Sequence, residues 1–512
     1  MNSRTAGARL FCIQVEEWMI VSTGRKLNNA SAARENQVYP LMPLPEKEAW
    51  PALIALCIGF FMILLDQTIV AVSTPALQED MGATYNEVIW VTSIYLLTFA
   101  VPLLITGRLG DKFGPKNVYA AGMIIFTVSS LACGLAPDMM SLIIARGVQG
   151  FGAALLTPQT MATINRIFSI ERRGAALGIW GTTAGLATLA GPIVGGVITE
   201  NWGWQWVFYI NVPIGVISVL AVLKYVPAFP PHTRPLDPLS MLLSATAMFL
   251  LVFALQQGEV VGWVAWIWVM IIVALVLGYG FVRQQARLAQ AGSDPLIPLD
   301  IFRIRNFSLG NISIVAMGFT VAGIPLPIML YFQQIHGMGP MQAGFMMIPQ
   351  ALVAVLLSPS IGRLVDKRNP NTMAALGFGV SSLSILGLSL MMILDAPIWV
   401  ALVSMFFLGV GNSLIWAPNS TSTMRDLPGR FMGAGSGVYN TTRQLGSVMG
   451  AAAIGAVLQV RLVAGDGGAA FGQALLLPTV VLLVGVVASL LAENATPEAT
   501  RARLAAKADR SV

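Results

Sequence analysis

From Trp50 to about residue 491, the chain alternates between apolar runs of roughly 18–25 residues and short polar segments. A run of this length crosses a hydrocarbon core of about 30 Å as an α-helix. We count fourteen such runs and predict that each is a transmembrane helix. Their approximate limits are 50–76, 87–107, 117–136, 139–163, 174–199, 206–226, 238–257, 263–283, 306–332, 341–361, 372–393, 397–420, 431–459 and 471–491.

The composition supports the same fold class. Of the 512 residues, 56% are hydrophobic and only 11% are charged, whereas a soluble protein has about 25% charged residues. The sequence therefore predicts an all-α polytopic membrane protein. Its three cysteines form neither a disulfide framework nor a metal-ligand pattern, so no metal site is expected.

The basic residues indicate how the helices are oriented. With the N-terminus inside, 27 of the 30 Lys and Arg residues fall in inner segments. This bias predicts a protein of the cell membrane with both termini in the cytoplasm. It also accounts for the net charge of +6 without a nucleic acid partner. Residues 1–48 are either a cytoplasmic tail or a segment that precedes a translation start at Met42.

A repeated loop indicates two related halves. Gly107–Lys116 is basic and rich in glycine, and a shorter copy stands 255 residues later at Gly362–Lys367. The same offset relates Gly191 to Gly446 and Gly195 to Gly450. Halves of six helices in parallel orientation are one architecture of secondary transporters. We predict a tail at 1–48, a first half at 49–226, two linker helices with loops at 227–305, a second half at 306–492 and a tail at 493–512.

Five motifs together resemble those of the major facilitator superfamily, and within it the fourteen-helix drug:proton antiporters. This resemblance implies the major facilitator fold, with two extra helices between the halves. The motifs are the loop Gly107–Lys116 between helices 2 and 3, Leu64–Val70 in helix 1, Arg146–Gly150 in helix 4, the antiporter motif Gly191–Gly196 in helix 5, and Trp204–Pro213 at the start of helix 6.

Asp66 lies inside the first span, where a carboxylate costs roughly 2.5–3.5 kcal/mol to insert. It stands 16 residues after Trp50, which is about 24 Å from the inner face at 1.5 Å per residue. Arg146, in the fourth span, lies roughly 18 Å from that face by the same estimate. The two side chains are therefore expected to meet. We favour a role in proton coupling over a static ion pair or direct binding of a cationic substrate.

The remaining candidates belong to three groups. Asp111 is expected to bind a helix N-terminus or basic residues, so that the loop closes the cytoplasmic side; an orientation signal alone would not explain the glycines. The helix 5 glycines either pack statically or, as the family resemblance implies, form a sliding surface between the halves, kinked at Pro192. Arg443 binds backbone carbonyls, a buried amide or an anionic substrate. The predicted residues are Gly107, Arg108, Asp111, Lys112, Gly114 and Asp366 in the gate; Gly191, Pro192, Gly195 and Gly196 in the antiporter motif; and Trp90, Tyr95, Gln149, Asn412, Asn440 and Arg443 at the cavity.

The sequence thus predicts a proton-coupled antiporter that exports drugs or other amphipathic small molecules by alternating access. The alternatives are export of a specific metabolite, lipid or siderophore, and proton-coupled import. A channel would need a continuous polar pore, and an enzyme would need a nucleophile–base or metal cluster. No phosphate-binding loop is present, so the proton gradient is the expected energy source, without a cofactor. The expected partners are the substrate, protons and the lipid bilayer, with no obligatory protein partner.

Overall fold

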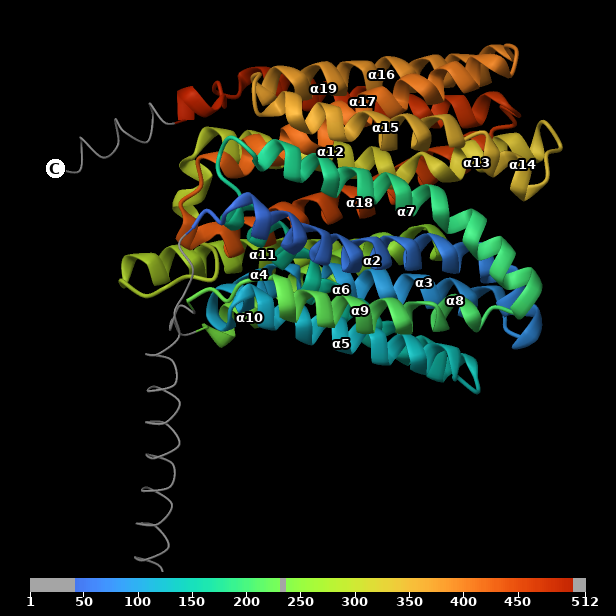
Figure 1. Ribbon diagram of the computed structural model, residues 1–512. Coiled ribbons are helices and arrows are strands. Elements are labelled where there is room, and N and C mark those ends of the chain that lie inside the picture. Colours follow the sequence, from blue (N-terminus) through green and yellow to red (C-terminus); the bar gives the residue numbers. More distant parts are fainter. Residues whose placement is uncertain (1–41, 231–235, 501–512) are drawn as a thin grey trace, which may run out of the picture. The chain divides into compact units, whose positions relative to one another are not determined.

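The computed structural model describes residues 42–230 and 236–500, and every regular element in these ranges is a helix (Figure 1). Thirteen helices in the described ranges are long and apolar enough to cross a membrane, and a bent pair makes fourteen if it counts as one span. The predicted fold class, an all-α polytopic protein, is confirmed.

The helices that precede residue 231 belong to the first predicted half. They are α2 (Glu46–Asp80), α3 (Tyr85–Ala100), α4 (Leu103–Phe113), α5 (Pro115–Gly134), α6 (Met139–Ile167), α7 (Arg173–Trp202), α8 (Trp206–Tyr209) and α9 (Asn211–Tyr225).

The helices after residue 235 are the two predicted linker helices and those of the second half. They are α10 (Pro238–Val261), α11 (Ala265–Gln290), η1 (Leu299–Arg303), α12 (Arg305–Gly323), α13 (Pro325–Gln334), α14 (Pro340–Phe345), α15 (Ile348–Val365), α16 (Pro370–Leu394), α17 (Trp399–Arg425), η2 (Gly429–Phe431), α18 (Met432–Val463) and α19 (Ala469–Leu491).

Three predicted spans are interrupted next to a proline. The span predicted at 87–107 is the bent pair α3 and α4, whose axes differ by 48°. Pro102 stands between them, and a proline removes a helical hydrogen bond and its ring clashes with the preceding turn. The span predicted at 306–332 consists of two helices, α12, which ends at Gly323, and α13, which begins at Pro325. The span predicted at 341–361 likewise divides into α14, which ends at Phe345, and α15, which begins at Ile348 and has Pro349 in its first turn. Apolar length predicted the three spans but did not predict these breaks.

The helices expose large apolar side chains on many outer faces. Leu383, Leu394 and Val276 are 68%, 72% and 63% exposed. Soluble proteins rarely expose contiguous apolar surface on this scale, so these faces are suited to contact lipid chains. The opposite faces pack within the protein: α16 contacts both α17 and α19, and α5 contacts α6.

The predicted halves meet chiefly along two helix pairs, with smaller contacts of α17 on α7 and of α18 on α6. Helix α4 packs on α18, and α15 packs on α7. Helix α10 pairs with α11 and also contacts α3 and α18. Met248 and Val252 of α10 share a cluster with Leu97 of α3 and Val448 of α18. The linker helices therefore lie against the place where α3 and α18 approach each other. The division into two six-helix halves remains a prediction.

Candidate functional site

Asp66 and Arg146, which the depth estimate placed at one level, are in direct contact. Arg146 donates from Nη1 to Asp66 Oδ2 at 2.6 Å. Both residues are buried, with exposures of 0% and 1%. The guanidinium also lies over the Tyr95 ring, 4.2 Å from its centroid, and donates from Nε to the carbonyl oxygen of Val91. The pair is held by α2, α3 and α6.

Two amides complete the shell of the Asp66 carboxylate. Gln149 Nε2 and Asn211 Nδ2 each donate to Asp66 Oδ1 at 3.0 Å. Gln149 Oε1 also accepts from Arg146 at 2.7 Å. Asn211 is fixed in turn, because its Nδ2 also donates to Ser130 Oγ at 3.0 Å. Both carboxylate oxygens therefore have partners, as a buried charge requires.

The second half has no such pair at the corresponding sequence positions. The offset of 255 places Val321 opposite Asp66 and Ala401 opposite Arg146. A charge that is buried among four helices responds strongly to any change in its neighbours, because the local dielectric is low. This arrangement can couple protonation of the carboxylate to movement of α6 or α9 relative to α2.

Asp111 joins α4 to the start of α18. Its Oδ2 accepts from the backbone N–H of Ala434 at 3.1 Å, and its Oδ1 accepts from Arg166 at 2.8 Å. The carboxylate thus lies at a helix N-terminus, where free N–H groups and the helix dipole favour negative charge. We call Asp111, Gly433 and Ala434 the first latch.

Asp366 makes the matching contact in the second copy of the loop. The backbone N–H groups of Gly174 and Ala175, at the start of α7, donate to its two oxygens at 2.8 and 2.9 Å. We call Asp366, Gly174 and Ala175 the second latch. Both latches join the two predicted halves, and no pattern in the sequence identified the helix that each aspartate binds.

The latches correct the register of the repeat. The two aspartates are 255 residues apart, but the glycines that receive them, Gly174 and Gly433, are 259 residues apart. The offset of 255 therefore does not extend to these helix starts. Helices α7 and α18 begin at different distances from the loops that precede them, and contact between the halves sets which glycines correspond.

We predict that the second latch responds to pH. Burial raises the pKa of Asp366 to about 6, although the N–H groups of Ala175 and Gly174 and the charges of Arg425 and Arg172 lower it. An open, hydrated Asp366 would have its ordinary pKa near 3.8. Asp366 therefore binds a proton more tightly in the closed latch than in the open one. Because acid favours the conformation with the higher pKa, the fraction of molecules with a closed latch should rise as the pH falls from 7 to 5. Distances between spin labels on α7 and α15 would measure this.

The matched control is Asp366→Asn, which keeps the size of the side chain and cannot ionise. Its label distances should not change between pH 5 and 7. An Asn variant with the wild-type pH response, or a wild-type latch that opens on acidification, would contradict the prediction.

In this conformation the antiporter-motif glycines do not all face the opposite half, and the sliding surface that the resemblance implied remains a prediction. An added Cβ at Gly195 would meet Ile69 of α2, which belongs to the same half, and Gly191 likewise adjoins Thr68. A Cβ at Gly196 would meet nothing within 4 Å. The side chain of Pro192 lies outside the described residues.

It is the other end of α7 that contacts the second half closely. A Cβ on Gly178 would lie 2.7 Å from Gly362 Cα, and one on Gly107 would lie 2.9 Å from Gly437 Cα. Glycine on both sides lets the backbones of α7 and α15, and of α4 and α18, touch. The glycines of α7 thus make two kinds of contact. Those near the start of the helix contact the second half, and two of those near its end contact α2 of the first half.

The other gate residues lie around the first latch. Arg108 is buried, and its Nη1 lies 3.7 Å from Asp111 Oδ2. Lys112 lies over the Phe113 ring. Gly114 ends α4 with φ of +86°, a backbone conformation that glycine adopts readily, and Pro115 begins α5 at a position that proline favours.

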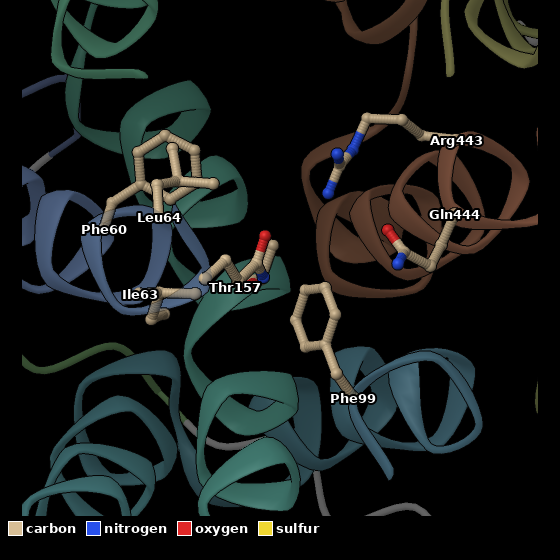
Figure 2. Close-up of a pocket in the computed structure, with 8 residues that line it drawn as sticks. Phe60, Ile63, Leu64, Phe99, Thr157, Arg443 and Gln444 are labelled. Carbon is tan, nitrogen blue, oxygen red and sulfur yellow. The ribbon is translucent and has the colours of Figure 1, made fainter. Parts of the chain in front are cut away.

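A small cavity lies between the two halves (Figure 2). Its free volume of about 20 Å³ is little more than one water molecule needs. Figure 2 shows the Arg443 guanidinium directed into it from α18, opposite Phe60 and Leu64 of α2. The residues that line it are Phe60, Ile63, Leu64, Gln67, Phe99, Thr157, Arg443 and Gln444.

Arg443 is the one predicted cavity residue among this lining. Tyr95 and Gln149 are fully buried at the Asp66 pair. Trp90 contacts Phe253 of α10, and Asn440 donates to the Ser436 carbonyl within α18. Asn412 lies half-buried on α17. The other five residues thus lie elsewhere in the fold. The sequence could not select the lining residues, because helices that are apolar on every face carry no pattern that shows which side lines the cavity.

Asn211, Ser130 and Phe60 are the main residues that the sequence prediction missed. Asn211 falls within the motif Trp204–Pro213, and a lone amide inside an apolar span could have marked it. Phe60 carries no comparable signal. Among the described residues, no group of three His, Cys, Asp or Glu side chains is arranged to hold a metal ion.

Comparisons with known proteins agree with this architecture. The family model "Major Facilitator Superfamily" matches residues 56–451. An uncharacterised MFS-type transporter of Mycobacterium tuberculosis is 42% identical over 471 residues, which cover 87% of this chain and 81% of that protein. The tetracenomycin C resistance and export protein of Streptomyces glaucescens is 31% identical, with coverage of 81% and 76%.

Two further matches extend this result. The riboflavin transporter RibZ of Clostridioides difficile is 30% identical, with coverage of 79% of this chain and 87% of that protein. Among solved structures, the proton:xylose symporter XylE bound to 6-bromo-6-deoxy-D-glucose matches with a TM-score of 0.63 and 14% identity. It covers 87% of this chain and 95% of its own. At that identity the structural match shows the fold alone.

Proposed function

The chain belongs to the Major Facilitator Superfamily, and we propose that it is a proton-coupled antiporter that exports drugs or other amphipathic small molecules. Members of this family are transporters of the membrane and not enzymes. Relatives that are named for resistance to tetracenomycin C and methylenomycin A support export of drug-like compounds. Membership of the fourteen-helix drug:proton antiporters is part of the proposal.

The observation that carries proton coupling is the closed shell around Asp66. The carboxylate accepts one ion-paired and two amide hydrogen bonds and has no exposed surface. Its partners come from α6 and α9, so a relative movement of these helices would break at least one bond and change its affinity for a proton. The carboxyl group would then bind a proton in one conformation and release it in the other.

The latches support alternating access. Both join the halves at the loops that the basic residues assign to the cytoplasm, so we propose that the described conformation is closed on the cytoplasmic side. In this proposal both termini are cytoplasmic, the protein lies in the cell membrane, and the energy source is the proton gradient. The two aspartates would release α7 and α18 when the cytoplasmic side opens.

Transport by the purified protein in liposomes with an imposed pH gradient would test the proposal. A panel that includes an aromatic polyketide, riboflavin and a cationic dye would be offered without ATP. At least one compound should move against its concentration gradient, and a protonophore should stop this movement. Movement at the same rate with and without the pH gradient would contradict proton coupling.

The second candidate function is export of one specific metabolite. The similarity to a riboflavin transporter supports it, since that relative is named for a single vitamin. The same liposome panel separates the two functions. A drug exporter should transport several unrelated compounds, whereas a metabolite exporter should transport one and exclude the others.

A further inference from the structure

We propose that Arg443 binds an acidic group of the substrate, so that this protein prefers amphipathic anions to cations of the same shape. The proposal deepens the transport function and rests on it. It assigns both a chemical class to the substrate and a role to the one charged side chain among those that line the cavity between the halves.

The first argument is the position of Arg443. Its guanidinium points into the cavity, towards the face formed by α2 and α6 (Figure 2). It lies over the Trp416 ring, with 6.0 Å to the centroid. Among the described residues, none of the ion pairs includes Arg443. A cation in so apolar a place without a counter-ion favours binding of an anion.

The second argument comes from the contrast with Asp66. That carboxylate would attract a cationic substrate if a ligand could reach it, but it is 0% exposed and its oxygens are occupied by Arg146, Gln149 and Asn211. The charge that a ligand meets in the cavity is therefore positive. The two opposite charges of the central region have separate tasks, since one is enclosed and the other faces the cavity.

The rest of the lining indicates the shape of the ligand. Phe60 stacks on Trp180 at 4.7 Å, and it presents an apolar wall together with Ile63, Leu64 and Phe99. Gln444 and Gln67 add amide groups that donate and accept hydrogen bonds. A flat apolar body with a carboxylate, sulfonate or phosphate at one end matches these features, because a guanidinium binds such groups with two parallel hydrogen bonds.

The size of the cavity adds a condition. Ligand sites usually measure about 300–1,000 Å³, whereas this cavity has a free volume of about 20 Å³. A substrate of drug size can therefore enter only when the halves separate and enlarge the cavity. The acidic head would replace lost contacts by pairing with Arg443, while a cationic head would face the guanidinium and be repelled.

Binding of three matched naphthalene probes would test the proposal. 1-Naphthaleneacetate, 1-naphthalenemethanol and 1-naphthylmethylammonium share one apolar body and differ in charge. The full-length protein, in nanodiscs of phosphatidylcholine, would be titrated with each probe and followed by quenching of tryptophan fluorescence. We expect the acid to bind at least tenfold more tightly than the amine, with the alcohol between them.

Variants identify the residue responsible. Arg443→Gln should remove the preference for the acid, and Arg443→Lys should keep part of it, because lysine retains the charge but not the two-pronged geometry. Arg287→Gln, which removes an exposed charge on α11, should bind like the wild type. A preference for the amine, or a preference for the acid that persists in Arg443→Gln, would overturn the proposal.

A lipid headgroup is another source of the same acidic chemistry. If added phosphatidylglycerol displaces the acidic probe from the wild type but not from Arg443→Gln, the anion site is supported and a lipid is its ligand. If it has no effect, a soluble anion is supported. These measurements need no gradient, so a failure of gradient-driven transport would refute proton coupling without altering the binding result.

Discussion

Replacing Asp66 by Asn is expected to abolish transport driven by a pH gradient while the protein still folds. An amide of the same shape cannot take up and release the proton, so the conformational change loses its link to the gradient. Counterflow, the exchange of labelled for unlabelled substrate without a gradient, should persist. Transport into liposomes, measured with and without the imposed gradient, separates these two activities.

The same substitution should lower thermal stability. It leaves Arg146 buried without its counter-charge, and breaking a buried ion pair costs about 3–5 kcal/mol. The double variant Asp66→Asn/Arg146→Gln removes both charges and should recover much of the melting temperature, yet still fail to use the gradient. This separation distinguishes a coupling residue from a static ion pair, for which the double variant would recover transport as well.

Asp80→Asn is the matched control, because it makes the same change in the same helix. Asp80 is the last residue of α2, 14 residues after Asp66. It accepts a hydrogen bond from Trp204 Nε1 and does not contact the buried pair. This variant should keep gradient-driven transport. Full coupled transport by Asp66→Asn would show that the assignment of Asp66 is wrong.

Replacing Gly178 by Val should reduce transport to background. An added Cβ would lie 2.7 Å from Gly362 Cα and 2.8 Å from the Ser358 carbonyl oxygen, which is closer than side-chain carbons approach backbone atoms. The clash is with the α15 backbone, so no rotamer change can relieve it. The two halves should therefore fail to close at the second latch, and the cycle should stop.

Gly196→Val is a control on the same helix, since a Cβ there meets nothing within 4 Å. It should express and transport like the wild type. Spin-label distances between α7 and α15 would show whether Gly178→Val holds the latch open. Normal transport by Gly178→Val, or an equal loss in both variants, would contradict a role for this close contact in closure.

Much of the fold followed from local features of the chain. Apolar length predicted all the spans, although three of them are broken next to Pro102, Pro325 and Pro349. The meeting of Asp66 and Arg146 could be estimated because rise per residue and bilayer thickness are nearly constant. The amides that complete this site could not, because the rotation of each helix about its axis depends on packing with neighbours that are equally apolar.

The repeated loop shows the same limit. Its aspartates were recognisable in the sequence as Asp111 and Asp366, but their partners, the starts of α18 and α7, depend on how the two halves face each other. The register of 259 between Gly174 and Gly433 is likewise a property of that contact. Even the division of the α7 glycines, with Gly178 facing α15 and Gly195 facing α2, follows from the crossing of helices.

The sequence by itself determined a helical membrane protein, the approximate limits of its spans and a carboxylate that needs a buried partner. Those properties follow from the cost of placing polar groups and unpaired backbone in lipid, which each segment meets on its own. Only the tertiary structure decided that Asp66 is enclosed and that Arg443 faces the cavity. Access to a charge depends on which side chains surround it, and in helices without a polar face only the packing of the whole chain sets that.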